Sequence, residues 1–222
     1  DSLCLEGKKI GGAAKLIATT NDATFWSQLT KVGVERTGAV CTVVKLEGKH
    51  ASANNRSWLP FTLRLYFYTG SEQVHMVHTF IYDGEAEKDM LRSIGVQFDV
   101  PMREATYNRH IAFATENGIW TEPVQPLDGR RILTINGDKK RNLQAEQMAG
   151  MRIPEAHAFD ANNAFLLDHW AQWDSYRLSQ LTDNAWSIRK RATAESHWIG
   201  TRTGSRATGY AFVGDVSGGL GV

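Results

Sequence analysis

Hydrophobic residues alternate strictly with polar ones over residues 61–68. Every second residue there is apolar, and the positions between them are Thr62, Arg64, Tyr66 and Tyr68. Side chains of a β-strand point alternately to its two faces, so the segment predicts a strand with one apolar and one Arg/Tyr-rich face. Residues 73–82 follow after a short loop that contains glycine, and the two segments together predict an antiparallel hairpin.

The same kind of alternation predicts further strands along the chain. These cover residues 40–47, 94–100, 185–192 and 208–213. Two segments have helical signals instead. Residues 142–149 end at Gly150, and a second helix is predicted to begin after Asp160 as its N-cap, with Leu166, Trp170 and Trp173 at helical spacing.

These elements predict a mainly β chain built as one large antiparallel β-sandwich. We expect a single module over residues 1–222, with a partly helical, irregular excursion over residues 114–175. The last eight residues, 215–222, have the composition of a loop that leads into another element. We therefore expect this sequence to be a piece of a longer, multidomain protein.

Composition limits the classes of partner. The 222 residues carry a formal net charge of +1, with a pI of about 8.0, so no global field favours nucleic acid or an acidic membrane. No apolar run approaches the roughly 18 residues of a membrane span, and residues 1–4 lack the features of a signal peptide.

Cys4 and Cys41 allow a disulfide or two thiols, and both alternatives stay open. No metal-ligand spacing such as CxxC or HExxH occurs.

A run of four polar residues carries candidate catalytic groups. Arg109 has a planar guanidinium that matches a carboxylate, and Tyr107 or His110 is a candidate acid or base. His78, in the predicted hairpin, is a second candidate base. The alternative is a polar strand end without chemistry.

Aromatic rings beside cations suit a ligand made of flat sugar rings and carboxylates. The candidate substrate-binding residues are Arg64, Tyr66, Asn108, Trp173, Lys190, Arg202, Arg206 and Tyr210. Solvated strand faces and surface ion pairs are the structural alternative for each of them. We interpret Arg189 and Arg191, on one face of residues 188–191, as part of a solvated strand.

Several segments resemble one family in their order along the chain. They are residues 34–38, 43–48, 59–66, 77–84, 107–110, 188–191 and 214–219. This order resembles the exo-acting rhamnogalacturonan lyases of polysaccharide lyase family 26 and the related YetA-like proteins. The resemblance implies the central β-sandwich module, of the galactose-mutarotase-like or super-β-sandwich type, of a secreted, extracellular enzyme of pectin degradation.

The resemblance also implies partners and chemistry. The partners would be an acidic plant cell-wall polysaccharide or oligosaccharide and other domains of the same polypeptide, with neither nucleic acid nor a membrane. No cofactor is expected, and a divalent cation such as calcium stays open. A lyase would remove the proton beside the uronate carboxylate, whose charge a cation neutralises, and expel the oxygen one carbon further on.

Two rival functions stay open. One is a carbohydrate-binding or scaffolding module without chemistry. The other is a glycoside hydrolase, which needs two suitably spaced carboxylates and could draw on Asp83, Asp89 and Asp99.

Overall fold

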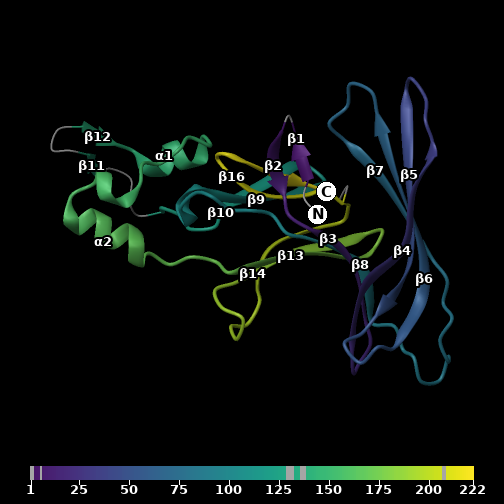
Figure 1. Cartoon of the computed structure of the whole chain (residues 1–222). Coiled ribbons are helices and arrows are strands. Elements are labelled where there is room, and N and C mark those ends of the chain that lie inside the picture. The colour runs from purple at the N-terminus through teal and green to yellow at the C-terminus, as the bar shows by residue number, and fades with distance from the viewer. Residues whose placement is uncertain (1–2, 6, 129–132, 136–138, 207–208) are drawn as a thin grey trace. The chain divides into compact units, whose positions relative to one another are not determined.

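The computed structural model of the chain describes residues 3–5, 7–128, 133–135, 139–206 and 209–222 (Figure 1). It contains two compact units, Asp1–Asp99 and Val100–Val222. Antiparallel strands dominate both units, so the prediction of a mainly β chain is confirmed. The expectation of one module over all 222 residues stays a prediction.

The first unit is built on a six-stranded antiparallel sheet with the order β7-β6-β5-β4-β3-β8. Its strands are β3 (Ala14–Thr19), β4 (Thr24–Arg36), β5 (Cys41–Ala51), β6 (Ser57–Tyr68), β7 (Val74–Phe80) and β8 (Ser93–Phe98), beside a two-stranded ribbon of β1 (Leu3–Leu5) and β2 (Lys8–Gly11). The predicted hairpin is confirmed, because Phe61 pairs with Phe80 and Phe67 with Val74.

The core of the first unit lies at one end of this sheet. Ala18, Phe25, Trp58 and Leu59 are buried together there, and the rings of Phe25 and Trp58 meet edge to face at 5.5 Å. The segment after β7 closes over them. A Cβ at Gly84 would lie 2.6 Å from the Trp58 ring, so only glycine lets the backbone approach this closely.

The second unit contains two small antiparallel sheets. One has the order β10-β9-β16-β17 and the other β13-β14-β15. Their strands are β9 (Arg109–Thr115), β10 (Gly118–Pro123), β13 (Ser175–Thr182), β14 (Ala185–Arg191), β15 (Ile199–Gly204), β16 (Ala211–Asp215) and β17 (Gly218–Gly221). Phe113 of β9 is buried against Trp186 and Ile188 of β14, so the sheets pack face to face.

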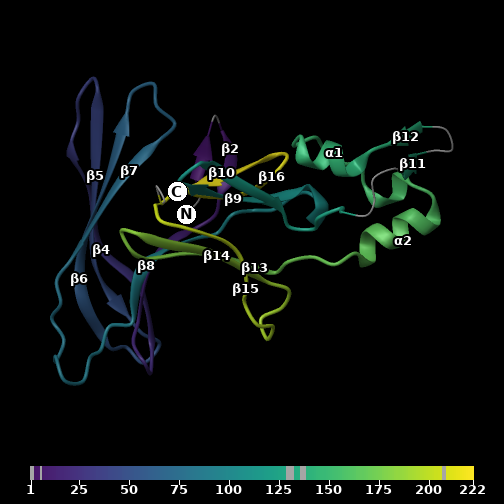
Figure 2. The ribbon, with the colours of Figure 1, turned by 180° about the vertical axis from the view of Figure 1, so that it is seen from behind.

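The residues between β10 and β13 form the helical excursion. They comprise β11 (Leu133–Ile135), β12 (Lys139–Arg141), α1 (Leu143–Met148), η2 (Ala156–Ala158) and α2 (Ala161–His169), which lie together in Figures 1 and 2. Both predicted helices are confirmed, and so is the predicted N-cap Asp160, while the structure adds Asn142 as the N-cap of α1. Asn142 accepts a hydrogen bond from the amide of Ala145 at 3.0 Å, and Asp160 accepts one from that of Asn163 at 3.1 Å.

Three sequence-based expectations need correction. The prediction that Trp170 and Trp173 belong to the second helix is wrong, because α2 ends at His169 and the backbone of Trp170 is extended. The end of the chain is no open loop: β17 pairs with β16, with Val213 opposite Leu220. The predicted strand at residues 208–213 begins at Ala211, and residue 208 lies outside the described residues.

Two smaller points concern membranes and cysteines. No helix of the described residues is long and apolar enough to cross a membrane. The sulfurs of Cys4 and Cys41 are not bonded to each other, and Cys41 is buried with its thiol directed at the carbonyl of Thr42.

Candidate functional site

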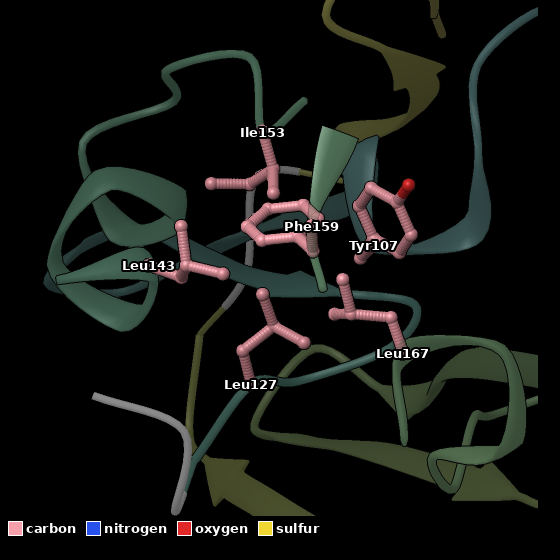
Figure 3. Close-up of a cluster of buried hydrophobic side chains, with 6 residues drawn as sticks. All are labelled: Tyr107, Leu127, Leu143, Ile153, Phe159 and Leu167. Carbon is pink, nitrogen blue, oxygen red and sulfur yellow. The ribbon is translucent and has the colours of Figure 1, made fainter. Parts of the chain in front are cut away.

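The four residues 107–110 do not form one exposed cluster. Residues Thr106–Asn108 make a turn of 3₁₀-helix (η1), and β9 starts at Arg109, so the run is not evenly extended. Tyr107 is 3% exposed and belongs to the cluster of buried residues shown in Figure 3. Its hydroxyl donates to the carbonyl of Pro154 at 3.2 Å, and burial raises its pKa. Its role as acid or base stays a prediction that this burial does not support.

Asn108 is also internal, with 1% of its surface exposed. Its side-chain amide donates to the carbonyl of Ile153 and accepts from the amide of the same residue, both at 2.8 Å. The side chain therefore fastens the segment after α1 to the start of β9. A saccharide has no access to these atoms, and the predicted binding role gains no support.

Arg109 and His110 are half-buried at the start of β9. The Nε of Arg109 donates to the carbonyl of Glu104 at 2.8 Å. Burial lowers the pKa of His110, and its Nε2 is buried without a hydrogen-bond partner among the described residues. Of residues 107–110, only Arg109 and His110 therefore keep part of their surface exposed.

The three candidates of the first unit do not share a surface. Arg64 is opposite Val77 in register, whereas His78 is opposite Leu63, so the two side chains lie on different faces of the sheet. Arg64 makes a two-pronged ion pair with Glu35, at 2.7 and 2.9 Å. The neighbouring Tyr66 places its ring 5.4 Å from that of His75.

His78 points to the face that contains the core of the first unit. Its ring centroid lies 6.0 Å from those of both His50 and Phe61. Burial lowers the pKa of His78, and nearby His50 lowers it further. Arg64, the predicted cation of this unit, lies on the other face of the sheet from His78.

Two predicted binding residues of the second unit do meet. The Nζ of Lys190 lies 4.1 Å from the centroid of the Trp173 ring and forms an ion pair with Glu122 of β10. Tyr176, opposite Lys190 in register, donates from its hydroxyl to the carbonyl of Pro123 at 3.3 Å. Burial and the charge of Glu122 raise the Tyr176 pKa far above its ordinary value. We call Glu122, Trp173, Tyr176 and Lys190 the Lys190 cluster.

The remaining predicted binding residues are exposed and separate from one another. Arg202 projects from β15 opposite Ile188, and the amide of Arg206 donates to Glu116 at 3.1 Å. Tyr210, just before β16, is 37% exposed. No hydrogen bond or ion pair among the described residues joins these three to the Lys190 cluster.

A different basic and aromatic group lies on the opposite face of the β13-β14-β15 sheet. Arg177 of β13 lies directly opposite Arg189 of β14. Arg191 points to the same face as Arg189, and Lys190 between them points to the other face. The guanidinium carbons of Arg177 and Arg191 lie 4.8 and 4.7 Å from the centroid of the Trp198 ring. We call Arg177, Arg189, Arg191 and Trp198 the arginine face.

Charge on the arginine face is unbalanced. Within the described part of the chain none of its three arginines forms an ion pair with a carboxylate. Arg191 donates one hydrogen bond, to the carbonyl of Ala194 at 2.6 Å, and its Nε is buried without a partner. Arg177 and Arg189 are exposed. Unpaired guanidinium groups beside an indole ring are suited to a ligand that joins a carboxylate to a flat ring.

Metal sites and paired acids have less support in the geometry. The described residues contain no group of three His, Cys, Asp or Glu side chains placed to hold a metal ion. Two of the acids considered for a hydrolase have structural partners. Asp83 accepts from the amide of Leu59 at 2.7 Å, and Asp89 is paired with Arg56.

Comparison with protein families identifies the chain. The family described as "PcRGLX-like protein central beta sandwich domain" matches residues 3–222. The chain belongs to this family. The resemblance seen in the sequence is therefore confirmed at the level of a rhamnogalacturonan-lyase-related family.

One curated relative of this PcRGLX-like chain is the "Uncharacterized protein YetA" of Bacillus subtilis (strain 168). The two are 29% identical over 235 residues, which include 99% of this chain and 26% of the relative. The chain thus spans about a quarter of the relative's length.

Sequence reasoning missed most of the arginine face of this PcRGLX-like chain. The alternation of Arg189 and Arg191 was visible, but it is equally typical of a solvated strand. Arg177 lies beside Arg189 only because β13 pairs with β14 in this register. Trp198 lies beside Arg177 only because the segment before β15 brings it there. Glu122 was missed for the same reason, because its pairing with Lys190 connects two sheets.

Proposed function

We propose that this chain is the saccharide-binding β-sandwich module of a lyase that cleaves galacturonate-containing rhamnogalacturonan by β-elimination. The observation that carries the proposal is the arginine face, whose three guanidinium groups lie beside Trp198 without a carboxylate partner among the described residues. Membership of the PcRGLX-like family supports the same substrate class.

The chemistry of a galacturonate residue fits this face. Its carboxylate accepts two parallel hydrogen bonds from one guanidinium fork, and the apolar side of a pyranose ring packs on an indole. With a net charge of only +1, the chain attracts an acidic polymer through a local group of cations, not through an overall field.

The elimination needs more than binding. A base takes the proton from the carbon beside the carboxylate, the bond from the next carbon to the leaving oxygen breaks, and a carbon–carbon double bond forms between the two carbons. An acid protonates the departing oxygen. A cation that neutralises the carboxylate stabilises the charge that develops on it, and Arg109 stays our candidate for this role within the chain.

A binding module without chemistry is the second candidate function. The burial of Tyr107 and Asn108 favours it, and so does the position of His78 on the face of its sheet opposite to Arg64. In that case the groups that transfer protons belong to other parts of the enzyme.

Calorimetry with a galacturonate-containing oligosaccharide of the rhamnogalacturonan backbone tests the binding proposal. We expect the double variant Arg177→Gln/Arg189→Gln to bind at least about tenfold more weakly, since two charge-assisted contacts are lost. Trp198→Leu should weaken binding of the same oligosaccharide as well. An oligosaccharide with its carboxyl groups reduced is the matched control, and the double variant should bind it as the unchanged protein does. Equal affinity of all proteins for the acidic ligand would contradict the proposal.

A rise in ultraviolet absorbance during digestion of the polysaccharide separates a lyase from a binding module, because elimination leaves an unsaturated uronate. We expect the rise with the full-length gene product that contains this sequence, and its loss in Arg109→Ala. Absorbance that stays flat while reducing ends accumulate would indicate hydrolysis instead.

A further inference from the structure

The strand β7 forms one edge of the six-stranded sheet of the first unit (Figure 1). Within the described part of the chain it pairs with β6 alone, from Phe61 opposite Phe80 to Phe67 opposite Val74. A strand that is hydrogen-bonded on one side only separates from its sheet at a lower cost in free energy than a central strand. Local opening of β7 would carry the side chains that it packs against β5 and β6 into water.

His78 is a titratable side chain that β7 places among apolar rings. It lies opposite Leu63, and the ring centroids of Phe61 and Phe80 lie 6.0 and 5.8 Å from its own. Its Nε2 is buried and has no hydrogen-bond partner among the described residues. In the charged form both ring nitrogens are donors, so protonation leaves a buried N–H without an acceptor. The closed position of β7 therefore favours neutral His78.

A second imidazole lies beside His78. His50 of β5 is fully buried, and its ring centroid is 6.0 Å from that of His78. The Nδ1 of His50 lies 2.8 Å from the carbonyl of Leu59, so this nitrogen carries a proton and donates it. The Nε2 of His50 is buried without a partner among the described residues, as is that of His78, so the two rings do not bond through these atoms. His50 thus offers no negative charge to balance a protonated His78.

Carboxylates of the first unit have other partners. Among the charged groups of β4 to β7, only His50 shares the face of His78. Register and ion pairs place the rest on the opposite face, namely Lys31, Glu35, Arg36, Lys45, Glu47, Lys49, Arg64 and His75. In the segment after β7, Asp83 accepts from the amide of Leu59, and Asp89 is paired with Arg56. A charge on His78 is therefore relieved by leaving the interior and not by pairing within it.

We propose that His78 is a pH sensor of the β6–β7 hairpin, and that its protonation opens β7 from β6 in weakly acidic solution. Opening carries the imidazole into water, which solvates its charged form. His50 has no such escape, because β5 is held between β4 and β6. Burial and the nearby His50 both lower the pKa of His78, as this role requires. The sensor is a property of the fold and is independent of any saccharide.

The direction of the pH dependence follows from the form of the hairpin that binds the proton more tightly. When β7 is open, the imidazole of His78 is in water and its pKa has the ordinary value of 6.5, whereas burial lowers this pKa when β7 is closed. The equilibrium constant for opening is therefore constant above pH 6.5. Below it, one bound proton raises this constant by up to about tenfold per pH unit, until the pKa of the closed form is reached.

Hydrogen exchange of the backbone amides of residues 74–80 tests the proposal. The rates are measured on the chain at several pH values and corrected for the intrinsic effect of pH on amide exchange, which gives the equilibrium constant for opening. We expect this constant to rise at least about threefold for β7 between about pH 7 and pH 5.5, and less than about twofold for the central strand β5.

Two variants separate His78 from the rest of its strand. His78→Gln keeps a polar side chain that does not titrate, and it should abolish the rise. His75→Gln is the matched control, because His75 belongs to the same strand and its ring lies 5.4 Å from that of Tyr66 on the opposite face. This control should keep the rise in full. NMR titration of the imidazole resonances gives the pKa of His78 in the unchanged protein, which tests the proposal even if His78→Gln fails to fold.

Several results would overturn the inference. A rise that persists in His78→Gln, or disappears in His75→Gln, would assign the sensor to another group. An equal rise over all strands of the sheet would mean that acid unfolds the first unit as a whole. Opening of β7 that does not depend on pH, or a pKa of His78 at or above 6.5 in the folded chain, would show that the hairpin does not sense protons through this residue.

Discussion

Asn108 shows how a polar residue chosen as a binding candidate can serve the fold instead. Its amide satisfies both backbone groups of Ile153 within the core of the second unit. Asn108→Ala leaves a buried N–H and a buried C=O without partners, so we expect the free energy of unfolding to fall by about 3 kcal/mol. Urea denaturation followed by tryptophan fluorescence measures it. Asn184→Ala, at an exposed turn, should change the same quantity by less than about 0.5 kcal/mol. Similar losses in the two variants would contradict this role.

The lowered pKa of His110 predicts how the free energy of unfolding depends on pH. Burial lowers its pKa in the folded chain below the ordinary value of 6.5, so the unfolded chain binds the proton more tightly. The contribution of neutral His110 to the free energy of unfolding is therefore fully present above the pKa that His110 has in the unfolded chain. This contribution is lost as the pH falls through 6.5 toward the pKa of His110 in the folded chain. His78, whose pKa is lowered by burial and by His50, acts in the same direction.

The measurement for His110 is the slope of the unfolding free energy against pH between about 7 and 5. We expect His110→Gln to reduce this slope and His197→Gln, at an exposed position, to leave it unchanged. Carboxylates with lowered pKa, such as Asp215, titrate below this window and do not interfere. An unchanged slope in His110→Gln would disprove the assignment.

At the scale of elements, the sequence predicts what is local. Alternation over residues 61–68 depends on near neighbours, and so does the N-cap Asp160, and both were predicted. What could not be predicted depends on register between distant segments. The opposition of Arg177 and Arg189 follows from how β13 pairs with β14, and the burial of Tyr107 follows from α1 and α2 packing over η1.

The link between Lys190 of β14 and Glu122 of β10 joins two elements of different sheets. Both side chains are largely withdrawn from water, with 13% and 19% of their surfaces exposed. Lys190→Met leaves the carboxylate of Glu122 unpaired near the half-buried Tyr176, so we expect a loss of about 3 kcal/mol in unfolding free energy. Adding Glu122→Gln should recover part of it, as a double-mutant cycle by urea denaturation would show. Losses that simply add would indicate that the pair is not coupled.

At the scale of the whole molecule, the net charge of +1 distinguishes a local site from a general attraction to acidic polymers. Arg189→Gln and Arg152→Gln change the net charge equally, from +1 to 0, but only Arg189 belongs to the arginine face. The guanidinium of Arg152 is already paired with Glu104 at 2.8 Å. A local site predicts that Arg189→Gln weakens binding of a galacturonate oligosaccharide by about tenfold and that Arg152→Gln changes it by less than about twofold. Calorimetry at two salt concentrations checks this. Equal losses in the two variants, both abolished by salt, would mean that net charge and not the arginine face attracts the ligand.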